Sequence, residues 1–303
     1  MKKSNKEFNK IDSISELHRF LGLPKPEHPL VSVVKCSDIR EENGEPITNY
    51  LNGFYIISVK KDFTGKMKYG QQYYDFDEGV MSFIAPGQMI SNTTTNHKGL
   101  SLIFHPDFIR NYPLAHIIKN YGFFSYSVNE ALHLSEKEEI MILLLMQNIE
   151  QEYHGAIDSL TQNVIVSQID LFLNYCNRFY NRQFITRSSV SNDLLVKLEN
   201  MLTEYFDNEK LSETGPPSVQ YISEQLHVSS NYLSDMLRSL TGQNTQQHIH
   251  SKLIEKAKEV LATTTLSVSE VAYQLGFEYT QSFNKLFKNK TNMSPREFRQ
   301  SFN

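Results

Sequence analysis

The sequence predicts a mixed α+β chain in two domains: a β-rich N-terminal domain with a helical extension, and an all-α C-terminal domain. Three observations support this prediction. Short runs of β-branched and aromatic residues, separated by turn signals, fill residues 30–105. From about residue 106 onward, the apolar residues recur at helical spacing. The length of 303 residues corresponds to about two domains.

The composition excludes several classes of protein. Hydrophobic residues make up 40% of the chain and charged residues 21%, which is ordinary for a globular protein and excludes a disordered or collagen-like chain. The two cysteines, Cys36 and Cys176, are too far apart for a metal-binding or redox motif. No apolar stretch follows the charged N-terminus, and the longest apolar run, 140–146, is far shorter than the ~20 residues of a membrane span. We therefore expect a cytoplasmic protein with no membrane partner.

The two parts of the chain differ in charge. The formal net charge of −4 by itself argues against a nucleic-acid partner. Residues 218–303 contain nine Lys and Arg against seven Asp and Glu, whereas residues 1–217 contain 21 against 27. Because phosphate contacts depend on local Lys and Arg, this asymmetry points weakly to a C-terminal part that faces nucleic acid.

In chain order, the first expected element is a short helix over residues 11–23. Ser13 and Glu16 have the spacing of a capping box, and three prolines follow the helix and end it. Residues 30–105 then contain several short strands at close spacing, separated by Asn-Gly, Thr-Gly and Pro-Gly turns. This pattern is typical of a small antiparallel β-barrel or sandwich.

Residues 138–182 predict a helical hairpin. Ser135 and Glu138 form a second capping-box spacing, and Gly155 marks the turn between the helices. The second helix has an apolar stripe at steps of three and four: Ile165, Ile169, Phe172, Cys176 and Phe179. The hairpin either only covers the barrel or also pairs with a second copy of the chain across a two-fold axis. We favour the second alternative, a homodimer formed through the 138–182 helices.

The Ser-rich residues 183–193 predict a linker. The N-terminal domain is then 1–182, with the barrel at about 30–105 and helices at 106–182, and the C-terminal domain is 194–303. The C-terminal domain begins with a helix whose apolar residues are Leu194, Leu195, Leu198, Met201, Leu202 and Phe206.

The C-terminal domain contains an internal repeat of residues 218–242 and 267–292. Residues that precede the central turn of the first copy have their counterparts 49 residues later in the chain. Residues that follow this turn have their counterparts 50 residues later. Before the turn, the matched pairs are Val219 and Val268, Ile222 and Val271, Gln225 and Gln274, and Leu226 and Leu275. After it, they are Leu233 and Phe283, Met236 and Leu286, Leu237 and Phe287, and Thr241 and Thr291.

Each copy predicts a helix-turn-helix motif. Ser218 and Ser267 are placed to cap a first helix, and Gly276 tolerates the positive φ of a tight turn in the second copy. Ser230 and Thr280 are expected to cap a second helix. In this motif the second helix enters the major groove of duplex DNA.

The outward positions of the two second helices are the candidate DNA contacts. With the two cap residues, the candidates are Ser230, Asn231, Ser234, Asp235, Arg238, Thr280, Gln281, Asn284, Lys285 and Lys288. Asn and Gln pair with adenine, and Arg and Lys with guanine or phosphate; Asp235 either accepts from cytosine or repels wrong sequences. A helix predicted over 245–262 connects the copies and should hold the two recognition helices about one DNA turn, roughly 34 Å, apart.

These segments resemble the AraC/XylS family of transcriptional regulators. The resemblance covers about residues 195–303 and lies in ISEQLHVSSNYLSDMLRSLTG, LIEKAKEVL and LSVSEVAYQLGFEYTQSFNKLFKNKTNMSPREFR. It implies a sequence-specific regulator that binds double-stranded DNA and, as an activator, RNA polymerase. Asn292 departs from the usual Gly of the family, but Asn also tolerates a left-handed turn. Leu253 stands where the family often has Arg, which puts a phosphate contact there in doubt.

The N-terminal domain resembles the cupin-like sensor domain of the same family. The similar stretches are YYDFDEGVMSFIAPGQMI and FHPDFI. The resemblance implies a domain that senses a small-molecule effector and dimerises. Because aromatic walls suit small ligands, the candidate ligand-binding residues are Tyr50, Phe54, Tyr55 and Tyr73. The alternative is that most of these aromatic residues belong to the barrel core.

No enzyme, metal or other cofactor is expected. Catalytic cupins bind a metal through several histidines, but residues 40–90 contain no histidine, and Ile90 stands where the last of them would be. His248 and His250 form the only His-x-His pair, and on a helix such positions point apart. The alternative function for the chain is a small-molecule binding module whose C-terminal helices contact something other than DNA.

Overall fold

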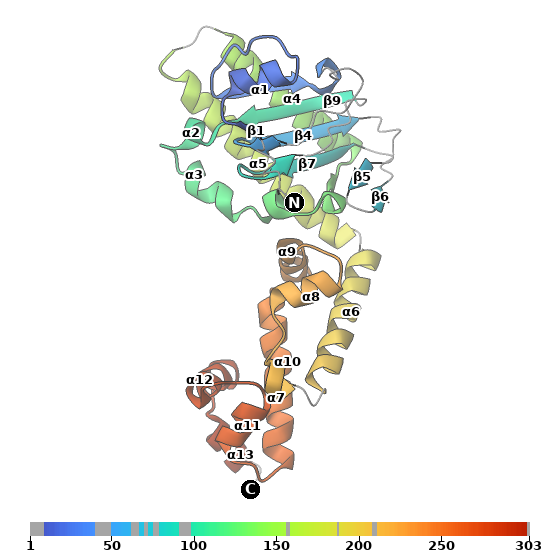
Figure 1. The fold of residues 1–303 in the computed structure, drawn as a ribbon, viewed down its shortest axis with the longest axis vertical. Helices are drawn as coiled ribbons and strands as arrows, with labels where there is room; N and C mark the ends of the chain where they lie inside the picture. The colour runs from blue at the N-terminus through green and yellow to red at the C-terminus, as the bar shows by residue number, and fades with distance from the viewer. Residues whose placement is uncertain are drawn as a thin grey trace, which may run out of the picture. The chain divides into compact units, whose positions relative to one another are not determined.

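The structure of the protein, a computed structural model, describes residues 9–39, 50–61, 67–69, 72–74, 79–90, 98–155, 158–186, 188–207 and 211–301. The chain divides into two units, Met1–Gln183 and Phe184–Asn303 (Figure 1). The first contains the described strands together with several helices, and the second is helical. The predicted α+β class is confirmed.

The strands of the N-terminal unit form three sheets. A five-stranded antiparallel sheet has the order β10-β7-β4-β9-β2, a three-stranded sheet has the order β1-β3-β8, and β5 pairs with β6. The strands are β1 (Asn9–Ile11), β2 (Val31–Lys35), β3 (Tyr50–Asn52), β4 (Tyr55–Lys61), β5 (Met67–Tyr69), β6 (Gln72–Tyr74), β7 (Val80–Ile84), β8 (Met89–Ile90), β9 (Lys98–Phe104) and β10 (Leu132–His133). Among the described residues these sheets do not join into a closed ring, so the predicted barrel is not confirmed.

The start of the chain differs from the prediction at Ile11. The sequence placed this residue in a helix, but it ends β1, which pairs in parallel with β3. Helix α1 (Ile14–Phe20) begins after Ser13, whose Oγ accepts from the Glu16 amide at 3.2 Å, as the capping spacing predicts. A strand of three residues has too few positions for an alternating pattern, and its partner is distant in the sequence, so the strand could not be predicted locally.

Both faces of the five-stranded sheet are covered. On one face, helix α1 and the three-stranded sheet form an apolar cluster of Ile11, Ile14, Leu17, Leu21, Val34, Tyr50, Phe54, Ile56, Ile90 and Ile103. Because side chains alternate along a strand, the neighbouring residues Ile57 and Leu102 lie on the opposite face, where both are buried. Helix α4 (Glu136–His154) packs against β2 and β9, and the hydroxyl of its Tyr153 accepts from the Val33 amide at 2.9 Å.

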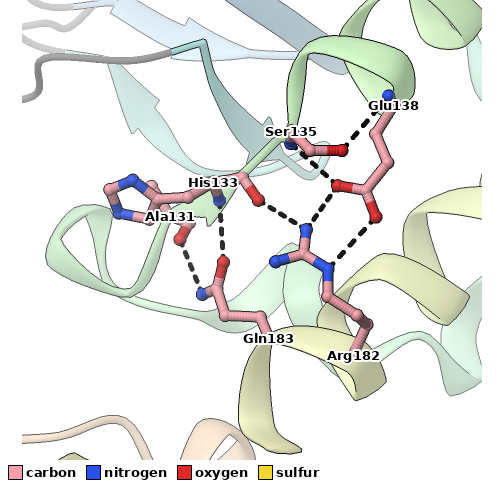
Figure 2. A network of polar contacts seen from close by, with 6 residues as sticks. All are labelled: Ala131, His133, Ser135, Glu138, Arg182 and Gln183. Atoms are coloured by element: carbon pink, nitrogen blue, oxygen red, sulfur yellow. Dashed lines mark hydrogen bonds and ion pairs between the residues drawn. The ribbon is translucent and has the colours of Figure 1, made fainter. Parts of the chain in front are cut away.

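Helix α4 and helix α5 (Thr161–Thr186) are the two helices of the expected hairpin. Ser135 caps α4 in a capping box, in which its amide donates to Glu138 Oε2 at 2.9 Å. Arg182 on α5 donates to both carboxylate oxygens of Glu138, at 3.1 and 2.5 Å, and to the His133 carbonyl at 2.8 Å (Figure 2). These contacts hold the last turns of α5 against the beginning of α4 and strand β10.

Gln183 extends this network along β10. Its side-chain oxygen accepts from the His133 amide at 2.8 Å, and its nitrogen donates to the Ala131 carbonyl at 3.1 Å (Figure 2). The amide side chain therefore pairs with one backbone donor of the edge strand β10 and with the carbonyl just before that strand.

Helices occupy most of the segment expected as a linker, residues 183–193. Helix α5 ends at Thr186, and helix α6 begins at Ser188. Ser191 within this segment is buried, so packing overrides the weak helix propensity of a Ser-rich sequence. In the described part of the chain, none of the helices has the length and apolar character needed to cross a membrane.

The C-terminal unit is built around helix α10. The helices are α6 (Ser188–Phe206), α7 (Leu211–Thr214), α8 (Val219–Gln225), α9 (Ser230–Thr241), α10 (Thr245–Thr263), α11 (Val268–Gln274), α12 (Thr280–Thr291) and α13 (Pro295–Gln300). Helix α10 packs against α6, α9, α11, α12 and α13, as expected for the predicted connecting helix. Leu253 is buried in this core, so that position does not offer a phosphate contact.

Candidate nucleic-acid interface

The first helix of each repeat begins where the sequence predicts. Ser218 Oγ accepts from the Tyr221 amide at 3.1 Å at the start of α8. Ser267 Oγ accepts from the Glu270 amide at 3.2 Å, and its own amide donates to Glu270 Oε2 at 2.7 Å, at the start of α11. The hydrogen bond from the Ser267 amide to the carboxylate is the largest cause of a lowered pKa of Glu270.

The turns that follow have left-handed backbone in both copies. Gly276 has φ +79°, as the prediction requires, and the matching His227 of the first copy has φ +57°. The second helices also end alike, because Gly242 after α9 has φ +75° and Asn292 after α12 has φ +59°. The substitution of Asn for Gly at residue 292 is therefore compatible with the same helix end.

The caps of the second helices are not the residues that the sequence predicted. Ser229 caps α9, since its Oγ accepts from the Tyr232 amide at 3.2 Å, whereas Ser230 is the first helical residue and its Oγ lies 2.7 Å from Ser223 Oγ. At α12, Tyr279 occupies the cap position without a side-chain hydrogen bond, and Thr280 is the first helical residue. Ser230 and Thr280 therefore have no capping role, because the extended backbone that defines a cap ends one residue earlier.

The outer face of α9 is partly engaged with the protein itself. Asn231 and Arg238 are exposed, as predicted. Ser234 is half-buried, and its hydroxyl lies 3.0 Å from that of the buried Thr245 at the start of α10. Asp235 accepts from Arg238 Nη1 at 2.7 Å. Of the four predicted outward residues, Ser234 thus faces α10, and the charges of Asp235 and Arg238 offset each other.

The outer face of α12 is open and basic. Its predicted contacts Gln281, Asn284, Lys285 and Lys288 are all exposed. The opposite side of α12 is fixed in the core by Phe283 and Phe287, which are fully buried. The apolar positions at i and i+4 therefore orient the polar row toward solvent, as the helical spacing predicts.

The His-x-His pair on α10 does not converge on one point. His248 Nε2 lies 2.9 Å from Thr241 Oγ1 at the end of α9, whereas His250 Nε2 lies 2.8 Å from the side-chain nitrogen of Gln246. Burial lowers the pKa of both imidazoles. Each histidine therefore has a local structural partner.

The comparison with known proteins concerns this part of the chain. Residues 222–301 match the sequence family described as "Helix-turn-helix domain". The chain is 31% identical over 120 residues to the HTH-type transcriptional activator RhaS of Salmonella schwarzengrund (strain CVM19633), a match that covers 39% of this chain and 41% of RhaS. The C-terminal unit contains a helix-turn-helix domain of the AraC/XylS type.

Two further relatives of this AraC/XylS-type domain show how far the likeness extends. The HTH-type transcriptional regulator YfiF of Bacillus subtilis (strain 168) is 29% identical over 143 residues, which cover 47% of this chain and 42% of YfiF. The C-terminal domain of the response regulator yesN from Fusobacterium nucleatum is 33% identical with a TM-score of 0.31, and the match covers 35% of this chain and 98% of that one. The chain thus spans about two fifths of the length of RhaS and YfiF.

Outside the AraC/XylS-type domain, the three candidate ligand-binding aromatics whose side chains the structure describes have different surroundings. Tyr50 and Phe54 are buried in the cluster under α1. Tyr55 stacks on Phe104, with ring centroids 5.2 Å apart, and burial raises the pKa of its hydroxyl. Tyr73 belongs to β6, and its side chain lies outside the described residues. For Tyr50 and Phe54 the structure favours the core alternative.

Proposed function

We propose that the chain is a sequence-specific DNA-binding transcription regulator whose helices α9 and α12 enter two adjacent major-groove segments. The observation that supports this proposal best is the exposed row Gln281, Asn284, Lys285 and Lys288 on α12, backed by a buried aromatic side. Amide and ammonium groups are the side chains that contact base edges and phosphates. The likeness to the activator RhaS and the regulator YfiF supports the same function.

Helices α9 and α12, the second helices of the two motifs, have different proposed roles in DNA binding. Helix α12 provides most of the electrostatic attraction, because the exposed Lys285 and Lys288 of its outer face are suited to displace counterions from phosphates. Helix α9 has one exposed cation, Arg238, already paired with Asp235. A duplex must therefore offer Arg238 a partner at least as good as Asp235, and guanine is such a partner because it accepts two hydrogen bonds. Helix α9 is thus the more selective of the two.

The proposal also includes an effector response and a homodimer formed through the 138–182 helices. On α4, Ile140 and Leu144 lie one turn apart and are 51% and 53% exposed, so this helix has apolar surface for a second copy. A ligand regulates such a protein only by binding one arrangement of the chain more tightly than another. The proposed protein acts in the cytoplasm, where its DNA lies, has no catalytic role, and as an activator also contacts RNA polymerase.

Selection of duplexes from a random pool by the intact purified protein tests this proposal. We expect an enriched motif with two contacted segments about one helical turn apart, present twice when a dimer binds. We also expect the affinity for this motif to fall linearly with salt on a logarithmic scale, with a slope of about −0.9 per phosphate contacted. If no motif is enriched and duplex binding is absent at low salt, the C-terminal helices have a partner other than DNA. A motif present only once would contradict the dimer.

A further inference from the structure

A row of polar residues lies on the face of the five-stranded sheet that also contributes to the apolar cluster under α1. Ser82 on β7, Ser58 on β4 and Ser101 on β9 are neighbours in the strand register. Because side chains alternate, Ser58 and Lys60 share the face of Ile56, which belongs to that cluster. The face is therefore apolar toward one end of the strands and polar toward the other.

Two serines of this row contact each other, and one of them also contacts a thiol. Ser58 Oγ lies 2.7 Å from Ser101 Oγ, and Ser101 Oγ lies 3.5 Å from the thiol of Cys36, which directly follows β2. These two hydroxyls and one thiol have three hydrogens between them but make only two mutual contacts. One hydrogen is therefore left to donate to another acceptor.

Lys60 adds a positive charge to the same place. It is half-buried, interacts electrostatically with Cys36, and lies opposite Gly99 on β9, so no neighbouring side chain on that strand covers it. Burial lowers the pKa of its ammonium to about 8. Charged and polar side chains on the inner face of a sheet are local exceptions to apolar packing, and such exceptions are typical of functional sites.

We propose that Lys60, Ser58, Ser101 and Cys36 form a binding site for a small oxyanion, the carboxylate or phosphate group of an organic ligand. The ammonium supplies a charge-assisted hydrogen bond, and the hydroxyl row supplies a neutral donor. The site gives the proposed effector a chemical class, and its biological role rests on the proposed effector response. Anion binding itself is measured without DNA, so its failure is distinct from failure of the proposed DNA-binding function.

The test is the unfolding temperature of the intact chain at constant ionic strength in the presence of acetate, inorganic phosphate or, as a neutral control, acetamide. We expect a saturable rise with at least one anion and none with acetamide. The acetate and phosphate arms distinguish a carboxylate from a phosphate ligand. Binding should weaken as the pH rises through about 8, because Lys60 then loses its proton while burial keeps Cys36 a neutral thiol.

Three variants make the test specific. Lys60→Met should weaken anion binding roughly 10- to 100-fold, and Ser101→Ala should weaken it less, because it removes a neutral donor. Lys35→Met is the matched control, since Lys35 is an exposed lysine on the same sheet. Equal responses of the wild type, Lys60→Met and Ser101→Ala would mean a general salt effect and overturn the proposal. So would the absence of a saturable response to either anion.

A separate observation concerns Tyr279 at the start of α12. It is 69% exposed and takes the cap position without a side-chain hydrogen bond, whereas Ser229 at the matching position of the first copy caps its helix. A Ser, Thr, Asp or Asn at this position would stabilise the helix, so the helix is less stable with tyrosine there. Residues that lower local stability are expected at functional positions.

We infer that Tyr279 contacts the sugar–phosphate backbone beside the groove that α12 enters. The N-terminal end of a recognition helix is the part nearest the DNA, and a tyrosine hydroxyl donates well to phosphate. This inference rests on the proposed function. A backbone contact weakens binding to all sequences alike when it is removed, which separates it from a base contact.

The test compares Tyr279→Ser with Tyr279→Phe, and uses Tyr273→Ser as a control at a 55% exposed tyrosine on α11. Tyr279→Ser should raise the unfolding temperature by roughly 3–6 °C because it restores a cap, yet weaken DNA binding about 5- to 20-fold. Tyr279→Phe should weaken DNA binding without the gain in stability, and Tyr273→Ser should leave binding unchanged. Unchanged DNA binding by Tyr279→Ser would overturn the inference, whereas a wild-type chain that binds no duplex would instead overturn the proposed function.

Discussion

Replacing Gly276 with alanine is expected to destabilise the C-terminal unit by about 3 kcal/mol or more, because two independent costs add. The residue has φ +79°, which strains any residue with a Cβ atom. A Cβ placed there would also lie 2.4 Å from Gly215 Cα and 2.8 Å from the Leu211 carbonyl oxygen. Both are backbone atoms, so the clash is not relieved by rotating a side chain. Urea unfolding of the intact chain, followed by circular dichroism, measures the loss.

His227 provides the matched comparison. It occupies the equivalent turn of the first copy with φ +57°, and its side chain is exposed. His227→Gly should therefore stabilise the protein by up to about 1 kcal/mol, since it removes the left-handed strain and little packing. If Gly276→Ala unfolds with the same urea midpoint as the wild type, the turn of the second copy is not constrained as the structure indicates.

Arg238→Ala is expected to cost about 1–3 kcal/mol of DNA-binding free energy and to relax specificity at one base pair. The loss has two parts, because Arg238 is removed from the DNA and Asp235 loses the cation that offsets its charge, 2.7 Å away. Asp235 would then repel the phosphates. Fluorescence anisotropy with the selected motif and single-base variants of it measures both the affinity and the change in specificity.

The lysines of α12 should behave differently from Arg238. Lys285→Ala should weaken binding to all duplexes alike and reduce the slope of affinity against salt by about 1. Lys197→Ala is the control, because it removes an exposed lysine of the same unit that belongs to α6 and not to α9 or α12. If Arg238→Ala and Lys285→Ala both bind like the wild type, α9 and α12 do not enter the groove.

The helices of the C-terminal unit were predictable because the signals that define them are local. An apolar side at steps of three and four, as at Phe283 and Phe287, places a helix face in the core whatever the rest of the chain does. The caps at Ser218 and Ser267 depend on residues a few positions away, and the glycine at residue 276 by itself permits the left-handed turn. The internal repeat strengthened each of these predictions, because the same spacing of apolar and capping residues occurs in both copies.

The caps of α9 and α12 show where local signals stop being sufficient. Ser229 and Ser230 are identical neighbours, and only the backbone angles of Ser229 decide which of them caps the helix. At α12 a hydroxyl was available at Thr280, but the extended residue is Tyr279. Moving the start of a helix by one residue hardly changes the match between its sequence and the helical pattern. Packing of the whole helix therefore decides which residue takes the cap position.

By itself, the sequence determined the mixed class, the repeated helix-turn-helix and the polar row on α12. The class follows from short β-branched and aromatic runs beside helical periodicity, and the other two features follow from spacing along a helix. Only the tertiary structure decided the pairing of β1 with β3, the contact of Ser234 with Thr245, and the contact of Ser101 with Cys36. These features join residues that are distant in the chain or on different elements. Their free energy depends on which elements pack together, and no periodicity within one element contains that information.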